Sequence, residues 1–73
     1  MKFIDSNIIA YAFYENELQR QCQNAIREGG IINALVLAEA FNIIEYHSSR
    51  TYAIQVIKSL LKSSLQIIPV DGN

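Results

Sequence analysis

The sequence is short of the residues that mark several classes of protein. Its 73 residues contain one cysteine, one proline and three glycines, and 51% of them are hydrophobic. So few prolines and glycines in so apolar a chain exclude collagen-like structure and intrinsic disorder. The single cysteine, Cys22, cannot form an internal disulfide, which fits a reducing intracellular compartment. For so short a chain, we expect stability to depend on oligomerisation or on a larger fold.

Net charge and long apolar runs are also nearly absent. Six Lys and Arg residues against seven Asp and Glu give a formal charge of −1, which excludes a strongly basic nucleic-acid clamp. This charge does not exclude a neutral enzyme that holds nucleic acid through a metal ion. The longest apolar runs, residues 8–13 and 34–38, are shorter than the roughly 18 residues of a membrane span. Asp5 and Asn7 would interrupt the core of a signal peptide, so we expect a soluble, cytoplasmic protein.

Three short apolar segments alternate with pairs of helical segments. The predicted strands are residues 1–4, 31–32 and 66–70, and the predicted helices are residues 8–14, 15–28, 34–46 and 51–63. This alternation is typical of right-handed crossovers between parallel strands. The sequence therefore predicts one α/β domain over residues 1–73, a three-stranded parallel sheet flanked by helices.

Two carboxylates are the candidate functional groups. Ligands of open parallel sheets bind outside the carboxyl ends of the strands. Asp5 ends the first predicted strand. Asn33 ends the second and is expected to cap the helix that follows, and Glu39 lies within two turns of that helix. We therefore expect Asp5 and Glu39 to converge at this edge, where a carboxylate in apolar surroundings needs a partner or a cation.

Each acid also has an ordinary structural interpretation. Asp5 precedes a helix and is a standard N-cap, although Ser6 and Asn7 are available for the same role. Glu39 shares a narrow polar stripe with Asn42 and Tyr46, so a solvated side chain explains it equally well. The sequence leaves both interpretations open beside the metal site.

Three segments, taken in order, resemble the motifs of PIN-domain nucleases. Residues 3–9, FIDSNII, resemble the family's opening strand, acid and helix. Residues 33–41, NALVLAEAF, resemble its second motif, in which a Glu on an apolar helix supplies another acid. Residues 65–71, LQIIPVD, resemble its third strand. The resemblance runs along the whole chain and corresponds to the N-terminal half of the family pattern.

The resemblance implies a fold, an activity and a site. It implies strand order 3-2-1 in this part of the sheet and hydrolysis of single-stranded RNA with Mg²⁺ or Mn²⁺. Asp5 and Glu39 match the catalytic, metal-binding acids, and Ser6, Asn7 and Asn42 are polar residues beside them. Many relatives are VapC-like toxin ribonucleases, which implies a toxin-type role and an antitoxin protein as partner.

The same resemblance predicts that residues 1–73 form an incomplete nuclease. In the family, further acids and the fourth and fifth strands follow the third strand. Asp71 does not match one of these acids, because Asp71 and Gly72 form a pair that is typical of a turn. Without a fourth strand, the first strand becomes an exposed edge of the sheet. We therefore expect a homo-oligomer in which the first strands of two copies pair edge to edge. The alternatives are a non-catalytic PIN fragment that oligomerises or binds a partner protein, and an unrelated α/β domain with accidental motifs.

The remaining candidates have weaker patterns. His47 is the sole histidine and is expected to be exposed at a helix end, which leaves no His and Cys cluster for zinc. The four tyrosines are expected to pack within the helices rather than to stack on bases. They are Tyr11, Tyr14, Tyr46 and Tyr52.

Overall fold

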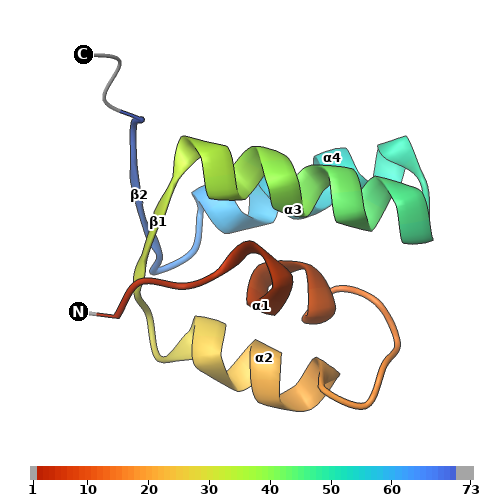
Figure 1. Cartoon of the computed structure of the whole chain (residues 1–73), viewed down its shortest axis with the longest axis horizontal. Helices are drawn as coiled ribbons and strands as arrows, with labels where there is room; N and C mark the ends of the chain where they lie inside the picture. The colour runs from red at the N-terminus through yellow and green to blue at the C-terminus, as the bar shows by residue number, and fades with distance from the viewer. Residues whose placement is uncertain (1, 71–73) are drawn as a thin grey trace.

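The computed structural model describes residues 2–70 and shows helices packed beside a small parallel sheet (Figure 1). In chain order the elements are α1 (Ser6–Tyr11), α2 (Gln19–Arg27), β1 (Ile31–Asn33), α3 (Ala34–His47), α4 (Arg50–Leu61) and β2 (Gln66–Ile68). The predicted α/β class is confirmed. The predicted turn at residues 71–72 lies outside the described residues. None of the helices in residues 2–70 is long and apolar enough to cross a membrane.

The sheet differs from the predicted one in its first strand. β1 and β2 pair in parallel, but residues 2–4 contribute only one bridge, between Phe3 and Ile31. Ile31 donates its N–H to the carbonyl of Lys2 at 2.8 Å and accepts from the N–H of Ile4 at 2.9 Å. The prediction of three strands is therefore wrong: the described residues form two. Asp5 already caps α1, so the segment ends before a ladder can extend.

The loop between α1 and α2 is longer than the sequence predicted. Asn16 donates its side-chain amide to the carbonyls of Tyr11 at 2.8 Å and Tyr14 at 2.7 Å. Its Oδ1 accepts from the N–H of Leu18 at 2.8 Å. Because this side chain satisfies backbone groups on both sides of the turn, α1 ends at Tyr11 and α2 starts only at Gln19.

α3 is the central helix, as its apolar sequence predicted. It packs against α1 on one side and α4 on the other, while α1 lies between α3 and α2 (Figure 1). Four large side chains of the core are essentially inaccessible to solvent: Ile9, Ile32, Ile44 and Leu60. They come from α1, β1, α3 and α4, so each of these elements is held by the same core.

The apolar residues of the sequence predict a buried face of α4 made of Ala53, Ile54, Ile57, Leu60 and Leu61, and the buried face in the structure is rotated from it. Ala53, Val56 and Leu60 are buried, whereas Ile54 and Leu61 are exposed at 42% and 60%. The buried positions follow the i, i+3, i+7 spacing of one helical stripe. Sequence alone did not separate this stripe from the apolar residues along its border.

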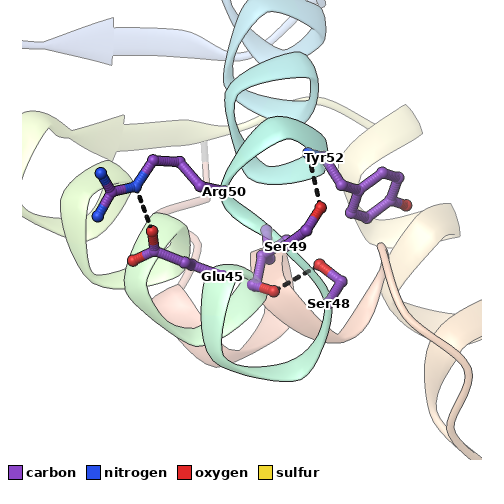
Figure 2. A network of polar contacts seen from close by, with 6 residues as sticks. Glu45, Ser48, Ser49, Arg50 and Tyr52 are labelled. Atoms are coloured by element: carbon purple, nitrogen blue, oxygen red, sulfur yellow. Dashed lines mark hydrogen bonds and ion pairs between the residues drawn. The ribbon is translucent and has the colours of Figure 1, made fainter.

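The turn between α3 and α4 is held by side chains (Figure 2). Ser49 caps α4 by accepting from the N–H of Tyr52 at 3.1 Å, and Ser48 donates its hydroxyl to a backbone carbonyl of α3 at 2.6 Å. Arg50 pairs with Glu45 at 2.6 Å, and this hydrogen bond raises the pKa of the Arg50 guanidinium. The helix break predicted at residues 47–50 is confirmed in position but is shorter, because α3 extends to His47 and α4 starts at Arg50.

Candidate metal centre

Asp5 lies exposed where the chain leaves the segment that pairs with β1, residues 2–4, and enters α1. Its Oδ2 accepts a hydrogen bond from the backbone N–H of Asn7 at 3.1 Å, so Asp5 itself is the N-cap. Ser6 is the first helical residue, and neither it nor Asn7 takes over the capping role. A carboxylate has about four lone-pair positions, so one hydrogen bond leaves room for a cation. Capping and metal binding by Asp5 are thus compatible.

Two contacts fix the position of Asp5 relative to the rest of the fold. The residue before it, Ile4, is buried and donates its N–H to the carbonyl of Ile31 in β1. The helix after it, α1, packs against α3 (Figure 1). Asp5 is therefore fixed between the segment that pairs with β1 and α1, a helix that contacts the one carrying Glu39.

Glu39 lies in the second turn of α3 and is exposed to solvent. The next residue, Ala40, is completely buried in the core, so Glu39 borders the covered face of the helix. Both acids are exposed, which is compatible with a metal site and equally with two solvated side chains. Their joint role as ligands stays a prediction.

The three polar residues predicted beside Asp5 and Glu39 differ in how far they are exposed to solvent. Ser6 is half-buried, whereas Asn7 and Asn42 are exposed. Asn42 follows Glu39 by three residues on α3, and it borders an apolar hollow between α3 and α4. The other residues around this hollow are Ala34, Leu37, Ala38, Phe41 and Ile57. Asn33, expected at the strand end, accepts from the N–H of Val36 at 2.8 Å and caps α3 as predicted.

The donor set suits a hard cation with an incomplete protein shell. Residues 2–70 contain no group of three or more His, Cys, Asp or Glu side chains placed to hold a metal. Mg²⁺ is commonly bound through only one or two carboxylates with water in the other positions. Burial raises the pKa of the Cys22 thiol, so this residue is not the thiolate that softer metals require. Asp5 and Glu39 therefore fit Mg²⁺ or Mn²⁺ better than zinc.

An aromatic cluster at the far end of α3 was missed by sequence reasoning. The rings of Tyr14 and His47 stack with centroids 4.3 Å apart, inclined by 20°. Tyr46 meets His47 edge to face at 5.2 Å, and Tyr11 meets Tyr14 in the same way at 5.9 Å. Burial, followed by the charges of Tyr11 and Cys22, raises the pKa of Tyr14. No sequence pattern signals this stack, because it joins residues from α3 and from the loop after α1.

The comparisons with known proteins give one match. A family model described as PIN domain matches residues 2–73 of the chain. Searches among curated proteins and among solved structures found no match.

Proposed function

This chain belongs to the PIN domain family, and from that premise we propose that it is a metal-dependent endoribonuclease acting on single-stranded RNA. The PIN domain is a nuclease-type fold, its members generally use divalent metal ions, and the family suggests RNA binding. In the proposal, Asp5 and Glu39 are the catalytic metal ligands and Mg²⁺ or Mn²⁺ is the cofactor.

One observation carries the proposal. The acid of the first motif is held at the end of the segment paired with β1, and the helix that it caps packs against the helix carrying the acid of the second motif. Asp5, which caps α1, and Glu39, which lies on α3, are far apart in sequence, but the two helices are in direct contact. Both carboxylates are exposed, so a phosphodiester can reach them.

The chemistry follows from what these side chains can do. A divalent ion, when bound, supplies a water of lowered pKa and neutralises charge that develops on the phosphate. Asp5 and Glu39 provide hard oxygen donors for it, and the N–H of Asn7 fixes the orientation of the Asp5 carboxylate. Ser6, Asn7 and Asn42 would donate hydrogen bonds to oxygen atoms of the phosphate.

The toxin-type role and an antitoxin partner belong to the same proposal. They rest on the resemblance of residues 3–9 and 33–41 to the motifs of toxin ribonucleases. A cytoplasmic location fits this role because the proposed substrate is RNA.

Replacing Glu39 by Gln tests the metal site. We expect the affinity for Mn²⁺, measured by isothermal titration calorimetry, to fall by at least about tenfold, because loss even of an outer partner of a metal ligand costs about 10–100-fold. Glu17→Gln is the matched control, since it removes one exposed negative charge from the loop before α2. Equal Mn²⁺ affinity in wild type, Glu39→Gln and Glu17→Gln would contradict the site.

A second candidate function is an oligomerising module, and the segment before α1 favours it. Phe3 is 54% exposed, while its neighbours Lys2 and Ile4 direct their backbone bonds to Ile31. Because backbone groups alternate along a strand, those of Phe3 face the open side, where a second copy can pair. We expect light scattering at micromolar concentration to give at least a dimer mass, with a shift toward monomer in Phe3→Lys. A wild-type monomer removes this candidate.

A further inference from the structure

Tyr46 is an exposed aromatic ring that contributes little to the core. Its exposure of 86% is the highest among the large apolar and aromatic side chains of residues 2–70 that lie on the surface. The ring nevertheless has a defined contact, because it meets His47 edge to face with an interplanar angle of 89°. The faces of Tyr46 are therefore available to a planar ligand.

The support beneath this ring is fixed at several points. His47 stacks on Tyr14, which is half-buried and packs against the core. The loop that carries Tyr14 is tied to α4, because the hydroxyl of Tyr52 donates to the carbonyl of Phe13 at 2.6 Å. A ring held in place before binding loses little conformational freedom when a ligand stacks on it. The cluster is thus a preorganised platform rather than a single loose side chain.

The platform lies in line with the proposed metal site. Tyr46 follows Glu39 by seven residues, close to two helical turns, so both project from the same side of α3 with exposed Asn42 between them. At 1.5 Å per residue, their backbones are about 10 Å apart along the helix. Stacked nucleotides are about 3.4 Å apart, so this stretch spans about three of them.

We propose that Tyr46, supported by His47 and Tyr14, is a base-stacking subsite for single-stranded RNA that runs along α3 past Glu39. The inference takes its substrate class from the function proposed above. Arg50, at the start of α4, is paired with Glu45, so recognition here depends on ring faces rather than on a free cation at this turn. Stacking on an aromatic ring is tolerant of sequence, because every base has a flat face.

The test measures RNA binding without metal or cleavage. The anisotropy of a fluorescein-labelled oligoadenylate is recorded in EDTA with wild type, Tyr46→Ala and Tyr46→Phe. We expect Tyr46→Ala to weaken binding by about 5- to 150-fold, the range given by losing one stacked base. Tyr46→Phe retains the ring and is expected to stay within about twofold, while Leu61→Ala, at an exposed position of α4, serves as the control.

A second ligand separates stacking from phosphate contacts. An abasic oligonucleotide of the same length keeps the phosphates, and Tyr46→Ala is expected to leave its binding unchanged. The inference is overturned if wild type does not bind oligoadenylate, if Tyr46→Ala binds it as wild type does, or if the abasic ligand shows the same loss. Because EDTA removes the metal, this binding test does not depend on cleavage. A loss of binding in Tyr46→Ala together with no cleavage activity in wild type would support the subsite and contradict the proposed nuclease activity.

Discussion

Asp5→Asn is expected to abolish metal-dependent RNA cleavage while leaving the fold intact. Asn keeps an oxygen that can accept from the N–H of Asn7, and Asn and Asp are nearly equivalent as N-caps. The variant therefore removes the negative charge without removing the cap. We expect the cleavage rate to fall by more than about 100-fold, since replacing an outer partner of a metal ligand already costs up to that factor.

The measurement pairs activity with stability. Cleavage of a fluorogenic single-stranded RNA is followed with Mn²⁺, and the free energy of unfolding is taken from urea titration. We expect Asp5→Asn to unfold within about 0.5 kcal/mol of wild type, and Asp5→Ala, which loses the cap as well, to cost about 1 kcal/mol. Wild-type activity is expected to disappear in EDTA. Full activity of Asp5→Asn, or an inert wild type with both Mg²⁺ and Mn²⁺, would contradict the proposed nuclease.

Gly30→Ala is expected to destabilise the protein because there is no space for the added methyl group. A Cβ at this position would lie 2.6 Å from the carbonyl oxygen of Lys2 and 2.7 Å from Cδ1 of Ile4. The first neighbour is backbone of the segment that pairs with Ile31, so it can move only if that pairing is disturbed. We expect a loss of about 1–3 kcal/mol in the free energy of unfolding, measured in urea.

The effect of Gly30→Ala should extend to the proposed metal site. Displacing residues 2–4 also displaces Asp5, so the affinity for Mn²⁺ is expected to fall with the stability. Gly29 is the control for steric space, because a Cβ added there would lie at an ordinary distance of 3.8 Å from Ser64. Its backbone has φ +85°, so a substitution at Gly29 tests backbone conformation rather than crowding. Gly29→Asn is expected to be tolerated better than Gly29→Ala, since Asn adopts this backbone region more readily. Unchanged stability in Gly30→Ala would show that the two segments are not in close contact.

Local signals were read correctly where a side chain acts on its own neighbourhood. Asn33 was predicted to cap a helix and does so, and the change of direction at residues 47–50 was predicted from its polar residues. The capping interpretation of Asp5 was also available from sequence. These features depend on bonds between residues two or three positions apart, so a pattern of residue types is enough to predict them.

Contacts between distant segments were harder to foresee. The first predicted strand is only a single bridge at Phe3 in the structure. Asp5 caps α1 directly after residues 2–4, so the chain enters the helix before more residues can pair with β1. The boundaries around the first loop shifted, because the side chain of Asn16 closes that turn. The stack of Tyr14 on His47 joins two elements through space and has no signature in either.

The sequence by itself determined the α/β class, the order of most elements, the apolar central helix and the two acids of the PIN motifs, since periodicity and short motifs encode these directly. Only the tertiary structure decided how many strands form, which stripe of α4 is buried, and that Tyr46 stands exposed beside a stacked pair. Those outcomes depend on competition between elements for the same space and the same backbone hydrogen bonds.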